Sequence, residues 1–197
     1  MLTRNKFLTL TLVVALCGLS ASALLGWTRH NSERRFSSAA WKEKYKSADE
    51  LVNRVDAIVL AKAVGAQPGR IAYSENGEDA LPFEVVRFEV VNGLKGARAG
   101  EQVSVERAGG TDSSGQAVNV DIDGGDFEIG NTYLLFLKHQ EDGPYYYQVN
   151  DQGRYQVAGR RLLAVDPGEE VSAIFHGKLV QEGLEIVKQK SKAAEKK

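Results

Sequence analysis

The acidic, glycine-rich stretch Asp121–Asp126 gathers the side chains of this chain that are best suited to hold a metal ion. It reads DIDGGD, and the carboxylates of Asp121, Asp123 and Asp126 supply the oxygen ligands that Ca²⁺ prefers. The order departs from an EF-hand loop, because Gly125 stands at a ligand position and Asp126 stands where the glycine belongs. We therefore favour a solvated acidic turn, keep Asp121, Asp123 and Asp126 as candidate calcium ligands, and expect no cofactor.

Three consecutive tyrosines, Tyr145, Tyr146 and Tyr147, form the densest aromatic group of the chain. Successive side chains of a strand point to opposite faces, so Tyr145 and Tyr147 share one face and Tyr146 takes the other. An exposed aromatic face on a small β-barrel can stack on sugars or bases. We expect at least one of the three to belong to the core and keep Tyr145 and Tyr147 as the candidate ligand-binding pair.

Residues typical of hydrolases occur without recognisable partners. Glu169 and Glu170 could serve as acid and base, but they follow Pro167-Gly168 and have no partner residue nearby in the sequence. We therefore expect them to lie in a solvated turn. Ser113, Ser114 and His139 do not form a nucleophile elbow. The sequence therefore predicts no catalytic residues, and a hydrolase assembled only in space stays as an alternative.

The N-terminal residues indicate where the chain goes. Arg4 and Lys6 precede the uncharged stretch Phe7–Trp27, and Ala21-Ser22-Ala23 has the small-residue pattern of a signal-peptide cleavage site. Residues 1–27 are predicted to be a signal peptide cleaved after Ala23 or, alternatively, a membrane anchor. Both alternatives place the remainder outside the cytoplasm: periplasmic, secreted, or held at a membrane by residues 7–27.

The single cysteine, Cys17, falls within this leader. Lipid attachment to Cys17 is disfavoured, because acylation requires a small residue directly before the cysteine and Leu16 occupies that position. The rest of the chain must therefore hold together by its core rather than by disulfides, and thiol catalysis and cysteine-ligated zinc are excluded there. The formal net charge of −1 argues against a nucleic-acid partner.

Short β-type patterns dominate the expected folded domain, residues 47–190. Ser47 to Glu50 reads as a capping box that opens a short helix, and Gln67 to Arg70 reads as a turn. Val180, Leu184 and Val187 form an apolar stripe that predicts a helix over residues 178–190. Expected strands lie at residues 57–64, 82–91, 102–106, 117–122, 131–138, 145–149, 153–157 and 161–165, of which 117–122 is an edge strand and the last three form a closing meander.

This pattern predicts a fold that is mainly β with flanking helices (α+β), arranged as a small barrel or sandwich. Residues 28–46, polar and mixed in charge, are expected to be a spacer that is partly helical around Trp41 and Tyr45. Residues 191–197 are expected to be a solvated basic tail.

Three segments resemble netrin-like domains, the superfamily that includes the tissue inhibitors of metalloproteinases. Asp49–Val64 is similar to the helix and first strand, Phe83–Gly96 ends in a similar Lys-Gly corner, and Gly125–Leu137 holds a similar x-x-G-x-x-Y-L strand. Exported bacterial proteins share these features with a Gln-Gly step like Gln152-Gly153 and a final helix. The resemblance spans residues 47–190 and implies an OB-type five-stranded β-barrel with an N-terminal signal or anchor helix and a packed C-terminal helix.

One departure from the family limits what the resemblance implies about activity. The animal inhibitors resemble a wedge whose N-terminal cysteine chelates the protease zinc, and the body of this chain has no cysteine. We therefore predict a non-enzymatic binding or assembly module of the cell envelope. Its partner would be an unknown protein or polysaccharide, with membrane contact through the N-terminal helix. An exported protease inhibitor and an envelope hydrolase are the alternatives.

Overall fold

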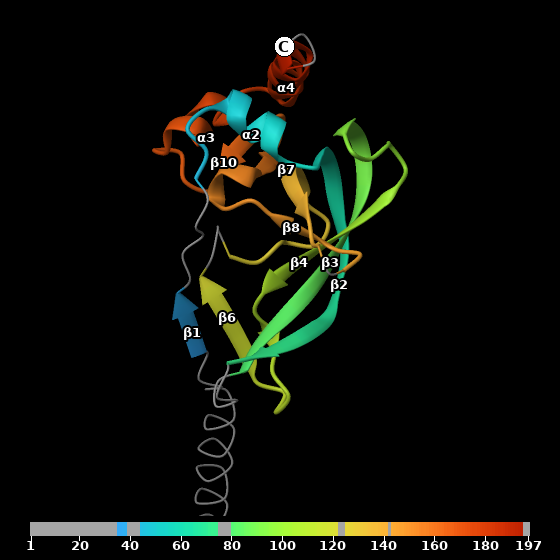
Figure 1. Cartoon of the computed structure of the whole chain (residues 1–197), viewed down its shortest axis with the longest axis vertical. Helices are drawn as coiled ribbons and strands as arrows, with labels where there is room; N and C mark the ends of the chain where they lie inside the picture. Colours follow the sequence, from blue (N-terminus) through green and yellow to red (C-terminus); the bar gives the residue numbers. More distant parts are fainter. Residues whose placement is uncertain (1–34, 39–43, 75–79, 122–124, 142, 195–197) are drawn as a thin grey trace, which may run out of the picture. The chain divides into compact units, whose positions relative to one another are not determined.

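The chain divides into residues 1–34 and a unit formed by residues 35–197. The computed structural model describes residues 35–38, 44–74, 80–121, 125–141 and 143–194 (Figure 1). Within these ranges no helix combines the length and the hydropathy needed to cross a bilayer. The signal or anchor helix predicted for residues 7–27 lies outside the described residues.

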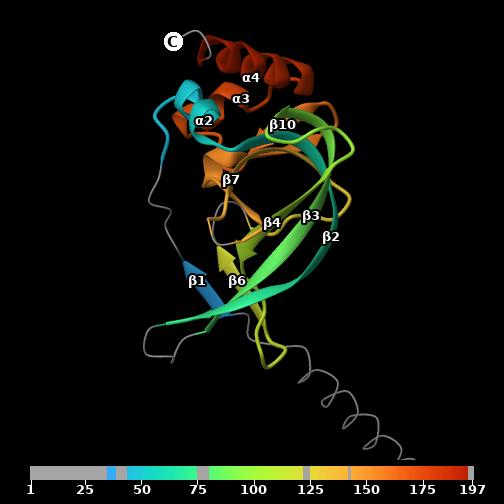
Figure 2. The same cartoon turned by 45° about the vertical axis from the view of Figure 1, so that its right-hand side comes forward.

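The unit is mainly β with a few helices, which confirms the predicted fold class at that level. The strands are β1 (Arg35–Ser38), β2 (Ala57–Tyr73), β3 (Ala80–Lys95), β4 (Gln102–Ala108), β5 (Gly110–Thr111), β6 (Ala117–Asp121), β7 (Thr132–His139), β8 (Tyr146–Gln148), β9 (Arg154–Ala158) and β10 (Arg161–Ala164). The helices are α2 (Ala48–Arg54), the 3₁₀ turn η1 (Asp151–Gly153), α3 (Glu170–Phe175) and α4 (Val180–Ala194). Helices α2, α3 and α4 gather at one end of the unit (Figure 2).

Five of the described strands are hydrogen-bonded in a closed ring. The pairings run from β2 to β3, β4, β8 and β7, and β7 pairs again with β2. All of these pairs are antiparallel except β4–β8, which meet in parallel at the bridge between Val105 and Tyr146. β9 and β10 continue the sheet outward from β7.

Alternate residues of the ring strands form one core, which we call the ring core. Phe127, from the segment before β7, completes it by meeting Phe88 and Tyr133 edge-on, with ring centroids 5.0 and 5.2 Å away. Its other buried members are Ala57, Val59, Ala61, Ala63, Val86, Val90, Val103, Val105, Leu135 and Leu137.

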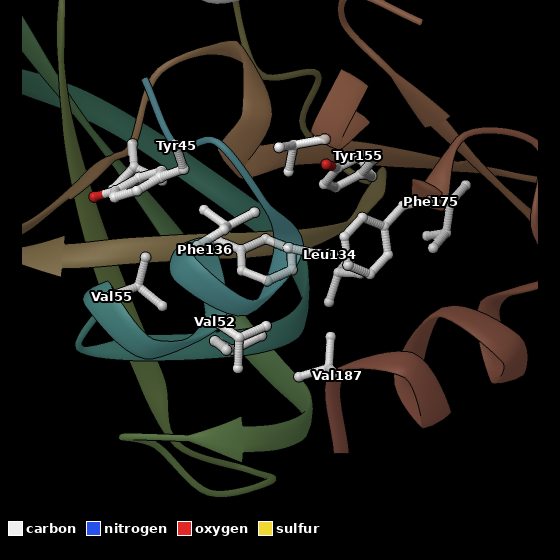
Figure 3. Packing of buried hydrophobic residues seen from close by; sticks show 14 of the residues in the cluster. Tyr45, Val52, Val55, Leu134, Phe136, Tyr155, Phe175 and Val187 are labelled. Atoms are coloured by element: carbon white, nitrogen blue, oxygen red, sulfur yellow. The ribbon is translucent and has the colours of Figure 1, made fainter. Parts of the chain in front are cut away.

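The opposite faces of β2 and β7 form a second core with the helices, which we call the helix-side core. Phe136 of β7 contacts the rings of Tyr155 and Phe175 with centroids 5.9 and 5.5 Å away. Val52 of α2 and Val187 of α4 lie on the same cluster (Figure 3). Because both faces of these strands are buried, their sequences read as near-continuous apolar runs.

The Lys-Gly corner has a structural role. The Lys95 ammonium donates to the carbonyls of Val52 and Asn53 at 3.1 and 3.2 Å, in the last turn of α2, where cations satisfy unpaired carbonyls. Gly96 has φ of +71°, and a Cβ there would lie 2.2 Å from the carbonyl oxygen of Asp56. Only glycine fits this close approach.

The Gln-Gly step is structural as well. The side chain of Gln152 is fully buried, and its amide pairs with the backbone of Tyr45. A Cβ on Gly153 would lie 2.9 Å from the carbonyl oxygen of Phe136. The step therefore joins the chain before α2 to the sheet.

The N-terminal boundary of the folded unit needs a correction. Tyr45 is not helical and is 5% exposed in the helix-side core, so part of the predicted spacer belongs to the fold. β1 falls in the same spacer and pairs in parallel with β6. Because β5 pairs with the other side of β6, the strand expected at the edge over residues 117–122 is instead, over its described residues 117–121, the central strand of a small sheet.

Two further expectations about strands are wrong. Gln67–Arg70 is not a turn, because β2 runs through it with a register shift between Pro68 and Ile71. Proline and glycine mark a bulge there rather than a reversal. The last three strands do not form one meander. β9 pairs with β10, but β8 pairs with β4 and β7 rather than with β9, and β8 and β9 meet different stretches of β7.

The C-terminal part confirms the predicted helix and adds another. Leu184 and Val187 of α4 are buried, and the helix continues to Ala194, into the segment expected to be a tail. Glu169 and Glu170 are not a solvated turn. Glu169 caps α3 by accepting a hydrogen bond from the Ser172 amide at 2.8 Å.

Candidate functional site

The three consecutive tyrosines occupy two faces of the ring. Tyr146 packs against the ring core, and its ring meets His139 edge-on with centroids 5.2 Å apart. Alternation along β8 therefore directs Tyr147 to the outer face. Tyr145 directly precedes β8 and continues its pairing with β7 through the hydrogen bond from the Gln140 N–H, so it takes the same face; both tyrosines are half-buried. The candidate ligand-binding pair thus lies on one surface of the ring.

Glu106 belongs to the same outer face. It follows Val105, the ring-core residue that bridges to Tyr146, so its side chain points outward beside Tyr147. Its side chain is only 1% exposed. The carboxylate atom Oε2 accepts hydrogen bonds from Arg70 Nε at 3.0 Å and from Gln140 Nε2 at 2.7 Å. These donors compensate for the desolvation of a buried carboxylate.

The bulge in β2 explains how Arg70 reaches Glu106. Opposite the bulge, a Cβ on Gly69 would lie 3.0 Å from the carbonyl oxygen of Phe83, so the two backbones are in close contact. The guanidinium of Arg70 then lies 4.4 Å from the centre of the Phe83 ring. Its Nε is bound to Glu106, and the side chain stays 59% exposed, so Arg70 remains accessible to a ligand.

Gln140 connects the carboxylate to the tyrosines. Its side chain donates to Glu106, and its backbone N–H donates to the carbonyl oxygen of Tyr145 at 2.9 Å. We call the surface made by these five residues the outer polar face, and its members are Arg70, Glu106, Gln140, Tyr145 and Tyr147. It combines a fixed guanidinium, a carboxylate and an amide with two aromatic rings.

In the acidic stretch Asp121–Asp126, the carboxylate of Asp126 pairs with an arginine side chain. The carboxylate of Asp126 binds Arg107, which also pairs with Glu84 at 3.1 Å. Asp123 lies outside the described residues, and for Asp121 only the backbone is described, in β6. No group of three or more His, Cys, Asp or Glu side chains that could hold a metal occurs among the described residues. The calcium site therefore stays a prediction.

Arg154 holds the segment next to Asp126 in place. It donates to the carbonyls of Gly125 and Asp126 at 2.8 and 2.7 Å, and its guanidinium lies 4.1 Å from the centre of the Phe127 ring. Burial lowers the pKa of Arg154, and the neighbouring Tyr133 opposes that shift. The arrangement fixes the loop over the ring core.

Three buried polar side chains, those of Gln152, Tyr155 and Ser172, surround the N-cap of α3. Glu169 accepts a second hydrogen bond from Gln152 Nε2 at 2.7 Å, and Tyr155 and Ser172 are fully buried beside it. Burial raises the pKa of Tyr155 well above its ordinary value, and its contact with Ser172 opposes that shift. Since Ser172 has no exposed surface, this group suits a structural role rather than attack on a substrate.

The remaining hydrolase candidates have separate partners. The Ser114 hydroxyl donates to Asp112 Oδ1 at 2.6 Å in the turn between β5 and β6. His139 lies at the end of β7, where its backbone N–H donates to Asp56 and its ring contacts Tyr146.

Comparison of the chain with protein-family models, with curated proteins and with solved structures finds no match. The resemblance to netrin-like domains therefore stays a prediction that rests on the motifs quoted above.

Proposed function

We propose that this chain is an extracytoplasmic binding or assembly module, built on an OB-type barrel, that holds a protein or polysaccharide partner of the cell envelope. The barrel is supported by the closed ring of five strands with one parallel pair. OB-type barrels are five-stranded and partly open, and they bind extended polymers on their surface. The signal or anchor sequence predicted for residues 1–27 supports the location.

The position of Glu106 is the observation that carries the proposal. Burying a carboxylate costs free energy that an apolar residue at the same place would not cost. The chain nevertheless keeps Glu106 on the outer polar face and orients it with Arg70 and Gln140. Preorganised polar groups beside aromatic rings are typical of binding sites. A stable core alone would not require them.

The inhibitor alternative would need a free N-terminal segment that wedges into a cleft. The described end of that segment is instead held by the core, because Tyr45 is buried and its backbone is bound by Gln152. The hydrolase alternative would need an accessible nucleophile, and the Ser172 hydroxyl beside Glu169 is buried. Both observations favour the binding module.

Affinity capture of the tagged chain from envelope fractions tests the proposal, with N-terminal sequencing of the mature form. We expect a specific partner that is retained by wild type and by Tyr73→Ala, because Tyr73 lies near the tip of the β2–β3 hairpin and is 64% exposed. The double variant Arg70→Gln with Tyr147→Ala should lose it. Absence of any partner, together with turnover of a small-molecule library, would contradict a binding module.

A further inference from the structure

We propose that the outer polar face binds an uncharged glycan chain, whose sugar rings lie on Tyr145 and Tyr147 while its hydroxyls bind Arg70 and Gln140, the two side chains that the buried Glu106 orients. The inference rests on the proposed binding function and names the ligand class of that same surface.

The polar groups of the face suit hydroxyls. The guanidinium of Arg70 is held by the Phe83 ring and by Glu106, so its terminal N–H groups are oriented before a ligand arrives. Arg70 and Glu106 also neutralise one another. The pair therefore offers directed N–H donors from the exposed Arg70 rather than a strong field, and the oxygen of an uncharged sugar hydroxyl can accept them.

The aromatic groups suit the ring faces of sugars. Tyr145 and Tyr147 are two positions apart on an extended segment, so their side chains lie roughly 6–7 Å apart on the same face. That separation places two aromatic rings along one extended polymer. Tyrosine presents an apolar ring together with a hydroxyl that can reach a ligand oxygen.

The distribution of apolar surface disfavours a protein at this face. A protein partner needs a patch whose centre is apolar. Among the described residues, the exposed large apolar side chains lie on β2, β3, β10 and the turn before β7, rather than on β4 or β8. They are Val64, Tyr73, Val91, Ile129 and Leu163.

Calorimetric titration of the full purified chain tests the inference, with cellohexaose, chitohexaose and hexagalacturonate as probes. At least one of the two uncharged hexasaccharides should bind. Tyr147→Ala and Arg70→Gln should each weaken that binding about tenfold. Tyr147→Phe should keep most of it, and Tyr73→Ala should leave it unchanged. Circular dichroism confirms that each variant is folded, and Arg70→Gln keeps the test valid if Tyr147→Ala fails to fold.

Several outcomes overturn the inference. Binding of hexagalacturonate alone would identify an acidic ligand. If an uncharged hexasaccharide binds wild type, Tyr147→Ala and Arg70→Gln equally well, the glycan binds elsewhere on the chain. If no hexasaccharide binds while envelope capture still depends on Arg70 and Tyr147, the glycan inference fails and the binding function stands. If no hexasaccharide binds and the wild-type chain also captures no envelope partner, both the glycan inference and the proposed function fail.

Discussion

The side-chain amide of Gln152 pairs with the backbone of Tyr45 as a neighbouring strand would. Tyr45 N–H donates to Gln152 Oε1 at 2.8 Å, and Gln152 Nε2 donates to the Tyr45 carbonyl at 2.9 Å. The same Nε2 donates to Glu169 at 2.7 Å. One buried amide thus joins the segment before α2 to the cap of α3.

Replacing Gln152 with leucine should destabilise the fold by about 2–4 kcal/mol, because the backbone groups of Tyr45 and the carboxylate of Glu169 would lose their partner. Urea unfolding measures this loss. The exposed Gln181 of α4 provides the control, and Gln181→Leu should change the free energy of unfolding by less than about 0.5 kcal/mol. Equal unfolding midpoints for Gln152→Leu and wild type would contradict the role of the amide.

Gly96→Ala should destabilise the chain far more than Gly100→Ala. Both glycines have positive φ, +71° and +84°, so each alanine carries a backbone strain of about 1–2 kcal/mol. A Cβ on Gly96 also meets the Asp56 carbonyl at 2.2 Å, whereas nothing lies within 4 Å of one on Gly100. The overlap should add about 1–3 kcal/mol to the cost at Gly96. Similar thermal midpoints for the two variants would show that the corner relaxes freely.

Glu169 should contribute stability that disappears in acid. Burial alone would raise its pKa, but hydrogen bonds from Ser172 and Gln152 hold it below the ordinary value of 4.5. The folded state therefore binds the proton less readily than the unfolded state. The contribution is fully present above pH 4.5 and is lost as the pH falls through the lower pKa of the folded state. The difference in unfolding free energy between wild type and Glu169→Gln should shrink from pH 7 to pH 3; a constant difference would contradict this.

Arg154→Lys should loosen the segment over the ring core. A lysine cannot bind the carbonyls of Gly125 and Asp126 together while lying flat on Phe127. We expect a loss of about 1–3 kcal/mol and faster hydrogen exchange at the Glu128 amide, which is bound to the Tyr133 hydroxyl at 2.9 Å. The exposed Arg160 offers the control, and Arg160→Lys should leave both quantities unchanged.

Local patterns in the sequence predicted the elements that depend on nearby residues. The capping box is confirmed, since Ser47 Oγ accepts from the Glu50 amide at 3.1 Å. The reciprocal hydrogen bond is shifted by one residue, because the Glu50 carboxylate accepts from the backbone N–H of Lys46 at 2.9 Å rather than from that of Ser47. The apolar stripe of α4 is confirmed for the same reason, as residues three or four apart share one helix face.

The outer polar face could be predicted only in part. Tyr145 and Tyr147 follow from alternation, but Arg70 and Gln140 join Glu106 from 36 and 34 positions away. Arg70 reaches it only because Pro68 and Gly69 form a bulge, and the same dipeptide is a common turn signal. β1 was missed for a related reason, because its four residues carry no apolar pattern of their own and pair with a distant segment, β6.

Photo-crosslinking in the intact envelope tests the central claim most directly, with p-benzoylphenylalanine replacing Tyr145 in one variant and Tyr73 in another. If the outer polar face holds the partner, light should yield a specific adduct from position 145, the Arg70→Gln change should reduce it, and position 73 should yield none. Adducts from position 73 but none from position 145, in variants that are folded and exported equally, would contradict the account.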